Sequence, residues 1–323
     1  MPASADGNAI EIKGLRKSYG DLMAVDDISL QVEPGELFGF LGPNGAGKTT
    51  TVNILTGVSL PTSGSASIHG HDVVRDSFRA KENLNVVPEV SNAYNEYTAW
   101  KNLMFTGALY GVPRKETALR AEELLQAFDL YDKRDAKVKG FSQGMRRKLV
   151  IAMALINEPR VLFMDEPTTG LDVQSVLTIR DMIRDLNRRG ITVFLTTHNL
   201  VEANLLCDRV AIINHGKIVA TDTPENLKRA ARSVQVVEVS FDRMTPEMED
   251  GVASLAGIRE ASRQGDKLRL ITEEPSSAIS AVNRFADEKG LAITHINTPG
   301  PSLEDVFVEL TGIRESAKGE ARR

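Results

Sequence analysis

The chain has 323 residues, of which 41% are hydrophobic and 26% are charged, and its formal net charge is −5. A chain of this length can bury a large core and usually forms more than one domain. The slightly acidic balance argues against a broad nucleic-acid surface, which normally needs a basic face. The longest apolar run, 149–156, is far shorter than the roughly 18 to 20 residues that span a bilayer. We therefore expect neither a nucleic-acid partner nor a membrane-spanning helix.

The N-terminus and the cysteine content predict the compartment. Residues 1–7 contain neither the basic segment nor the apolar segment of a secretory signal, and the one cysteine, Cys207, lies in an apolar helical pattern. We therefore expect a cytoplasmic protein without disulfides.

The first 75 residues predict strands around a glycine-rich loop, because short apolar runs alternate with turn residues, as at 33–36 and 61–64. The run 37–41 predicts a buried strand, and 48–57 predicts a helix that ends at Gly57. Between them lies a segment with the pattern G-x-x-x-x-G-K-[ST], namely Gly42-Pro43-Asn44-Gly45-Ala46-Gly47-Lys48-Thr49.

A strand, a glycine loop and a helix in this order form a phosphate-binding unit. Glycines let backbone N–H groups converge on a phosphate at the helix N-terminus, where Lys48 adds a positive charge. The hydroxyl of Thr49, which Thr50 follows, can ligate Mg²⁺. We therefore predict that the chain binds a nucleoside triphosphate with Mg²⁺ at residues 42–50.

Residues 98–158 predict a helical insert, because leucines recur at helical intervals among charges and a further helix begins after Ser142. Two buried strands, 161–164 and 191–195, follow with a helix between them. The first strand ends in Asp165-Glu166 and the second ends in Thr196-Thr197-His198. In a parallel βαβ unit these polar groups lie at the carboxyl edge of the sheet, where open α/β sheets bind ligands.

A second domain is predicted after residue 230. Its expected elements are strand 234–241, helix 246–255, strands 257–262 and 267–273, helix 276–289, strand 291–297 and a short helix at 303–310. This order resembles the split βαβ, ferredoxin-like arrangement.

The predicted fold class is therefore α/β. It comprises a P-loop cassette, 1–230, with a mixed sheet core, an antiparallel β portion and a helical insert at about 90–158. A small α+β domain, 231–312, and a charged tail, 313–323, follow it.

These motifs together resemble the ATP-binding-cassette (ABC) ATPases, and among them the separate ATPase chains that drive separate export permeases. The resemblance covers about residues 9–225. Besides the phosphate loop, it comprises an aromatic at Tyr19, a Q-loop-like segment at Val87-Pro88-Glu89, a signature-like segment at Phe141-Ser142-Gln143-Gly144-Met145, Asp165-Glu166, a D-loop at Gly170-Leu171-Asp172, and a switch histidine at His198.

The resemblance implies roles at one half of a nucleotide site. Tyr19 would stack on adenine, and Lys48 would bind the β- and γ-phosphates. Mg²⁺ would be held by Thr49 and Asp165, with an oxygen of Glu89 able to approach it. Glu89 stands where glutamine is usual, so a negative charge is added near the phosphates.

The same resemblance implies that Glu166 activates the attacking water and that His198 contacts the γ-phosphate. Ser142, Gln143 and Gly144 would close over the γ-phosphate bound by an opposite subunit. Asp172 would connect the two nucleotide sites across the dimer. The signature here is Ser-Gln-Gly-Met instead of the commonest Ser-Gly-Gly-Gln. One phosphate loop and one signature per chain imply a second copy of this chain or a related ATPase.

Simpler interpretations of single residues stay open at this stage. Ser142 can be an ordinary N-cap, Tyr19 a surface aromatic, and His198 a core histidine. The segment His69-Gly70-His71 favours a surface hairpin, so we expect no metal beyond Mg²⁺. The run 302–308 also resembles the ending of export-type ATPases and predicts dimer contact or regulation.

The resemblance also implies a place and a partner. The chain would work at the cytoplasmic face of the cell membrane, with a permease bound at a cluster of aromatics: Tyr94, Tyr97, Trp100, Phe105 and Tyr110. The alternative function is a cytosolic ABC ATPase that acts on ribosomes or DNA. A P-loop kinase or GTPase is disfavoured by the signature and His198.

Overall fold

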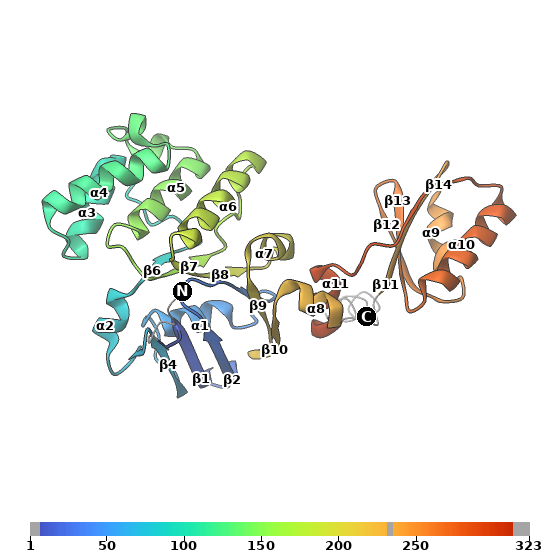
Figure 1. Cartoon of the computed structure of the whole chain (residues 1–323), viewed down its shortest axis with the longest axis horizontal. Helices are drawn as coiled ribbons and strands as arrows, with labels where there is room; N and C mark the ends of the chain where they lie inside the picture. The colour runs from blue at the N-terminus through green and yellow to red at the C-terminus, as the bar shows by residue number, and fades with distance from the viewer. Residues whose placement is uncertain (1–6, 231–234, 313–323) are drawn as a thin grey trace. The chain divides into compact units, whose positions relative to one another are not determined.

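The computed structural model describes residues 7–230 and 235–312, and the chain divides into two compact units between Thr221 and Asp222 (Figure 1). The domain boundary was predicted at 230–231, and residue 231 and the predicted tail, 313–323, lie outside the described ranges. Within those ranges, no helix is both long enough and apolar enough to cross a membrane.

The first sheet of the first unit is antiparallel. It has four strands in the order β2-β1-β4-β5: β1 (Ile10–Tyr19), β2 (Leu22–Val32), β4 (Ser63–Ile68) and β5 (His71–Asp72). The β4–β5 turn contains His69 and Gly70, as predicted for a hairpin. Buried side chains such as Ile10, Ile12 and Ile28 face the core.

The second sheet places the site. It has six strands in the order β10-β9-β3-β8-β7-β6: β3 (Leu37–Leu41), β6 (Leu84–Val87), β7 (Val161–Asp165), β8 (Thr192–Thr197), β9 (Arg209–Asn214) and β10 (Lys217–Asp222). Five of these strands, from β9 to β6, pair in parallel. The register sets Leu41 beside Thr197 and Asp165 beside Thr196. The carboxyl ends of β3, β7 and β8 therefore meet at one edge.

A shared apolar core joins the two sheets. Phe38, Phe40 and Phe163 pack around Phe194, with ring centroids 5.7, 5.5 and 5.4 Å from that of Phe194. Burying a large apolar side chain contributes roughly 1.5–3 kcal/mol. The strands that end at the site are thus held by their most apolar residues.

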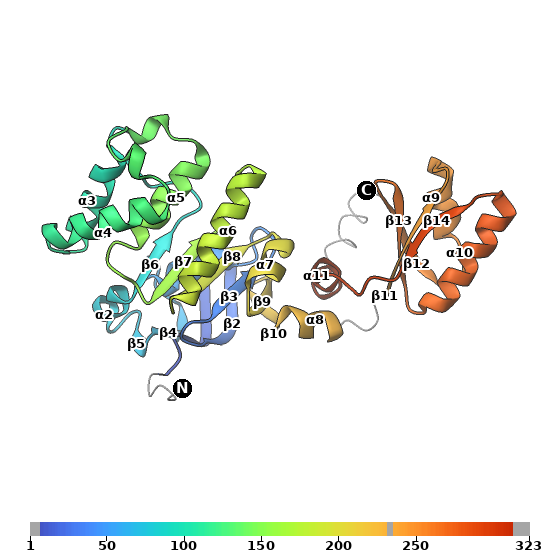
Figure 2. The same ribbon diagram turned by 45° about the horizontal axis from the view of Figure 1, so that its top comes forward.

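The helices of the predicted insert pack on one another (Figures 1 and 2). Leu103 and Leu125 are buried, whereas Leu109 and Leu119 of the same leucine pattern are exposed. The helices of the first unit are α1 (Lys48–Leu55), α2 (Ser77–Glu82), α3 (Ala99–Leu109), α4 (Arg114–Ala127), α5 (Gln143–Ala154), α6 (Val173–Arg188) and α7 (Leu200–Leu206), with 3-10 turns at Tyr131–Lys133 and Val138–Gly140.

The second unit contains an antiparallel sheet in the order β12-β13-β11-β14. Its elements are α8 (Pro224–Ala230), β11 (Gln235–Phe241), α9 (Pro246–Ala253), β12 (Ile258–Gln264), β13 (Lys267–Thr272), α10 (Pro275–Lys289), β14 (Ile293–Asn297) and α11 (Leu303–Thr311). From β11 to β14 this is the βαββαβ order of the ferredoxin-like arrangement, as predicted. The core includes Val237, Leu268 and Phe285.

Candidate functional site

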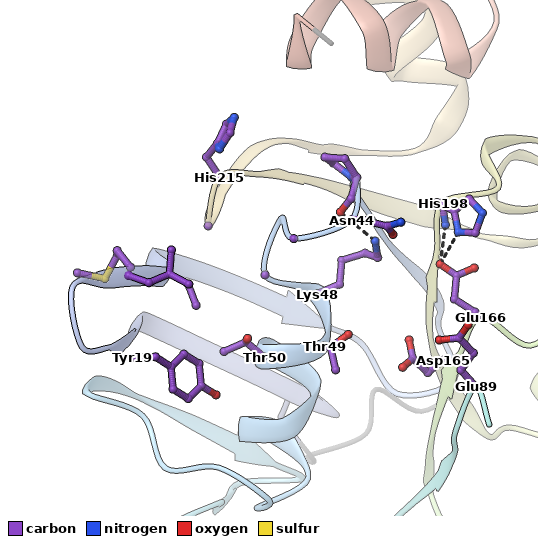
Figure 3. A pocket seen from close by; sticks show the side chains of 17 residues that line it. Tyr19, Asn44, Lys48, Thr49, Thr50, Glu89, Asp165, Glu166, His198 and His215 are labelled. Atoms are coloured by element: carbon purple, nitrogen blue, oxygen red, sulfur yellow. Dashed lines mark hydrogen bonds and ion pairs between the residues drawn. The ribbon is translucent and has the colours of Figure 1, made fainter. Parts of the chain in front are cut away.

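A pocket of about 470 Å³ opens at the carboxyl edge of the second sheet (Figure 3). Segments far apart in the sequence meet there because parallel strands end at the same edge. Its lining includes most of the predicted site residues: Tyr19, Pro43, Asn44, Gly45, Gly47, Lys48, Thr49, Thr50, Glu89, Asp165, Glu166 and His198.

Two glycines of the loop are required by close backbone contacts. A methyl group on Gly42 would lie 2.4 Å from the carbonyl oxygen of Ile213. At Gly47, where φ is 111°, it would lie 2.5 Å from the carbonyl oxygen of Ala24. Only glycine fits either position without a backbone shift. The loop leads into α1, whose first N–H groups have no acceptor within the helix and can bind a phosphate.

Lys48 supplies a positive charge, and its ammonium group is hydrogen-bonded to neutral carbonyl oxygens of the loop. Its Nζ atom donates to the carbonyl oxygens of Gly42 at 2.6 Å and Pro43 at 3.2 Å. Burial lowers the pKa of Lys48, and the carboxylates of Glu166, Asp165 and Glu89 oppose this shift. Hydrogen bonds between charged partners are stronger than bonds to neutral carbonyls, so a phosphate can replace these acceptors.

Oxygen ligands suited to Mg²⁺ lie beside the loop. Thr49 and Asp165 face the same part of the pocket, and Glu89 lies next to Asp165 (Figure 3). The Thr196 hydroxyl donates to Asp165 and fixes that carboxylate. Hydroxyl and carboxylate oxygens are the ligands that Mg²⁺ uses beside nucleotide phosphates, so these residues fit the ion.

Glu166 has an unusual backbone and a carboxylate that hydrogen bonds hold in place. Its φ is 45°, a left-handed value that is costly for a residue with a side chain. Its N–H donates to the Thr196 carbonyl oxygen at 3.0 Å, and its carboxylate accepts from the Thr197 hydroxyl at 3.2 Å. Such strain persists where surrounding bonds over-determine the conformation, as they commonly do at functional sites.

His198 completes this arrangement. Its backbone N–H donates to Glu166 Oε1 at 3.0 Å, and its Nδ1 lies 2.7 Å from the same oxygen. A carboxylate can only accept, so Nδ1 donates and Nε2 is left to act as an acceptor in the neutral ring. The His198 side chain is 58% exposed and that of Glu166 only 10%. The pair therefore joins a fixed, shielded carboxylate to an imidazole that a ligand can reach.

Tyr19 lines the pocket and is 49% exposed, with the Lys17 Nζ atom 4.8 Å from its ring centroid. The lining also includes residues that we did not predict: Leu22, Met23, Ala24, His215 and Gly216. The Gly216 N–H donates to the Ala46 carbonyl oxygen at 2.9 Å, which brings the β9–β10 turn against the phosphate loop. No sequence pattern marks this contact.

Six predicted residues lie outside the lining of this pocket: Gly42 and Ala46 of the phosphate loop, and Ser142, Gln143, Gly144 and Asp172. The Ser142 hydroxyl accepts from the Met145 N–H at 3.2 Å and caps α5. Asp172 caps α6 by accepting from the Ser175 N–H at 2.9 Å and its hydroxyl at 2.7 Å, bonds that lower the pKa of Asp172. A methyl group on Gly144 would lie 2.3 Å from the Ser175 hydroxyl oxygen, so the two caps form one surface.

Comparison with known families agrees with this geometry. Residues 25–169 match the model of the ABC transporter family, and residues 223–311 match that of the ATP-binding protein DrrA1-3-like, C-terminal domain. The chain belongs to the ATP-binding proteins of the ABC transporter family and is an ATPase of that family, as its motifs predicted.

Two relatives align over nearly their full lengths. The chain is 37% identical over 303 residues to the Nod factor export ATP-binding protein I of Cupriavidus metallidurans, which covers 94% of this chain and 97% of the relative. It is 37% identical over 311 residues to the daunorubicin resistance ATP-binding protein DrrA2 of Streptomyces coeruleorubidus. That alignment covers 96% of this chain and 97% of the relative.

Solved structures share the cassette fold. An ATP-binding subunit of an ABC transporter aligns with a TM-score of 0.63 at 29% identity, over 69% of this chain and 93% of that one. A dimeric ATP-binding cassette in a post-hydrolysis state, bound to ADP and Pi, aligns with a TM-score of 0.59 at 26% identity, over 66% and 98%.

Proposed function

We propose that this chain is the ATP-hydrolysing subunit of an ABC exporter, which dimerises on ATP and thereby drives a separately encoded membrane permease. The observation that supports it most strongly is the single pocket that unites the phosphate loop, Asp165 and the Glu166–His198 pair. Export is supported by the names of the relatives, which describe Nod factor export and daunorubicin resistance for those proteins.

In this proposal the pocket residues position ATP and water. Lys48 and the loop N–H groups hold the phosphates, and Tyr19 stacks on adenine. Thr49 and Asp165, with Glu89 beside them, hold Mg²⁺, which when bound neutralises phosphate charge. Phosphoryl transfer needs positioning and charge neutralisation more than covalent chemistry, and these residues supply both.

Glu166 is the residue that activates the attacking water. Its carboxylate is fixed by Thr197 and His198 beside the pocket, so it can orient the water and accept its proton. His198 contacts the γ-phosphate from its exposed side. The bond between these two residues couples the position of the base to the presence of that phosphate.

A complete site would need a second subunit. Ser142, Gln143 and Gly144 form an anion-binding helix N-terminus on a surface that the pocket of the same chain does not include. In a dimer this surface would close over the phosphates held by the partner, and Asp172 would connect the two sites. The partner would be a second copy of this chain or a related ATPase.

The permease would dock at the aromatic cluster, at the cytoplasmic face of the membrane. Tyr94, Tyr97 and Phe105 pack together, and 51% of Tyr94 and 41% of Tyr97 stay exposed. Exposed aromatic groups are typical of protein interfaces. Trp100, half-buried on the same helix as Phe105, is the variant to test: Trp100→Ala should weaken transport and spare basal ATPase activity.

The decisive experiment traps the assembly in its native cell. A tagged Glu166→Gln chain is solubilised from membranes with ATP present, next to the wild type and a Lys48→Ala chain. We expect a multi-span membrane protein in stoichiometric amount with Glu166→Gln, and much less with Lys48→Ala because nucleotide binding is lost. Recovery with ribosomes or DNA-associated proteins instead would favour the cytosolic alternative.

A further inference from the structure

A buried arginine joins helix α5 to the segment Val87–Glu89, here called the Q-loop segment. Arg147 lies in the second turn of α5 and is 8% exposed. Its Nη1 donates to the Pro88 carbonyl oxygen and its Nη2 to the Glu89 carbonyl oxygen, both at 2.7 Å. Two charge-assisted bonds from one planar group to consecutive carbonyls fix both position and orientation.

The charge of Arg147 also interacts with two carboxylates that line the pocket. Burial lowers the pKa of Arg147, and the carboxylates of Glu89 and Asp165 oppose this shift. The guanidinium nevertheless stays ionised at neutral pH. Arg147 thus offsets the extra negative charge that Glu89 brings to a position where glutamine is usual.

The two ends of this connection lie at the two parts of the proposed site. Glu89 lines the nucleotide pocket together with Lys48 and Asp165. At the other end, α5 begins at its N-cap Ser142, five residues before Arg147, which is about 7.5 Å along a helix. A helix is rigid over this length, so a shift at Arg147 moves the Ser142–Gly144 surface with it.

We propose that Arg147 is a positioning residue that transmits displacement of the Q-loop segment on nucleotide binding to the Ser142–Gly144 surface. The inference rests on the proposed function, which assigns the pocket and this surface to one ATP cycle. It adds a direct link between them within one chain.

The neighbouring arginine provides a matched control. Arg146 lies on the same helix and is half-buried, but its Nη2 donates to the Lys139 carbonyl oxygen at 3.0 Å. That bond joins α5 only to the segment that directly precedes it. Arg146→Met therefore removes the same atoms from the same helix and leaves the two bonds to Pro88 and Glu89 intact.

The test is hydrogen exchange measured by mass spectrometry on the full chain, with and without Mg²⁺ and the non-hydrolysable analogue AMP-PNP. Wild type, Arg147→Met, Arg147→Lys and Arg146→Met are compared in peptides that cover 42–55, 84–92 and 141–150. In wild type and Arg146→Met, we expect nucleotide to slow exchange in all three. In Arg147→Met, protection should persist at 42–55 and fall at least about threefold at 141–150. Arg147→Lys should give an intermediate result, because it keeps the charge and loses the fork.

Steady-state kinetics supply a second readout. For Arg147→Met we expect kcat to fall about tenfold while KM stays within about twofold, since nucleotide binding is preserved. An equal response of peptide 141–150 in wild type and Arg147→Met would overturn this inference alone. Absence of protection at 42–55 in the wild type would instead overturn the proposed function. A melting temperature for each variant separates a folding defect from a lost connection.

Discussion

The two units of this chain use buried charge in opposite ways. In the first unit, Lys48 is bonded to loop carbonyls and Glu166 to the exposed His198, so both charges lie beside an open pocket. In the second unit, Arg269 donates to Asp305 through Nη1–Oδ1 at 2.8 Å and Nη2–Oδ2 at 2.5 Å, and both side chains are shielded. A buried charge is thus evidence of function only where its partner can be replaced by a ligand.

The architecture explains this difference. In the first unit, parallel strands end together and their polar residues follow the last apolar position of each strand, as at Asp165 and His198. In the second unit the strands run antiparallel, and Arg269 bonds to a helix that follows the sheet. Its ion pair stabilises the packing of α11 and leaves no acceptor for a ligand.

The largest effect is expected for Glu166→Gln. Loss of the carboxylate that we propose as the proton acceptor should slow single-turnover ATP hydrolysis about 100- to 10,000-fold, while nucleotide binding is retained. Glu158→Gln is the matched control, because Glu158 is also a glutamate with positive φ but lies outside the pocket lining. A loss of less than about tenfold, or an equal loss in the control, would remove Glu166 from its proposed role.

Next in size is Arg269→Met, which leaves the Asp305 carboxylate buried without its partner. We expect the second unit to lose about 3–5 kcal/mol of stability, and ATP hydrolysis by the first unit to be unchanged. Hydrogen exchange of 235–272 reports the second unit, and fluorescence of Trp100, the one tryptophan, reports the first. The double variant Arg269→Met with Asp305→Leu should recover most of the loss. Equal destabilisation of both units would contradict the claim that this ion pair stabilises the second unit alone.

Glycines at close contacts offer a matched pair of tests. Gly144→Ala should destabilise the first unit by about 1–3 kcal/mol and reduce ATPase activity, because the new methyl group would overlap Ser175. Gly251→Ala, where the methyl would lie 2.9 Å from the Phe285 ring, should affect only the second unit. Gly140→Ala, with no atom within 4 Å, is the control for both. Unchanged unfolding of Gly144→Ala would show that the α5–α6 contact relaxes freely.

Acid should weaken the second unit through the same ion pair. Burial alone would raise the pKa of Asp305, but bonds from Arg269 and Ser302 lower it below the ordinary 3.8. A carboxyl group whose folded pKa is depressed stabilises the fold above its unfolded pKa, and this stability is lost as pH falls through the folded value. Urea unfolding followed by exchange of 235–272 should therefore show a loss below about pH 4 that the double variant lacks. If the stability of the second unit depended on pH equally in the wild type and the double variant, the Arg269–Asp305 pair would be excluded as the cause of the acid loss.

The smallest effect is expected for Glu89→Gln. The wild-type ATPase rate should depend more steeply on Mg²⁺ than that of the variant, because the carboxylate adds negative charge near the phosphates. We expect the Mg²⁺ midpoint to shift by less than about tenfold, under about 1.4 kcal/mol, since Lys48 and Arg147 offset that charge. Superimposable titrations would show that the substitution is neutral.

Local patterns were sufficient to predict the strands that end at the pocket, the phosphate loop, and the capping of α5 by Ser142. Each depends on neighbours in sequence: alternation or runs of apolar residues, glycines at positive φ, and a hydroxyl at a helix start. The order of elements in the second unit was predictable for the same reason. The pairing order β12-β13-β11-β14 then followed from the compact folding of a βαββαβ unit.

Contacts between distant segments were decided only by the tertiary structure. The approach of the His215–Gly216 turn to the phosphate loop, the two bonds of Arg147, and the pairing of Arg269 with Asp305 all join residues that no local pattern relates. Glu166 takes its left-handed backbone because bonds from β8 hold it there. Sequence periodicity reports which side of an element is apolar, whereas these contacts depend on how whole elements pack, and packing involves the entire chain at once.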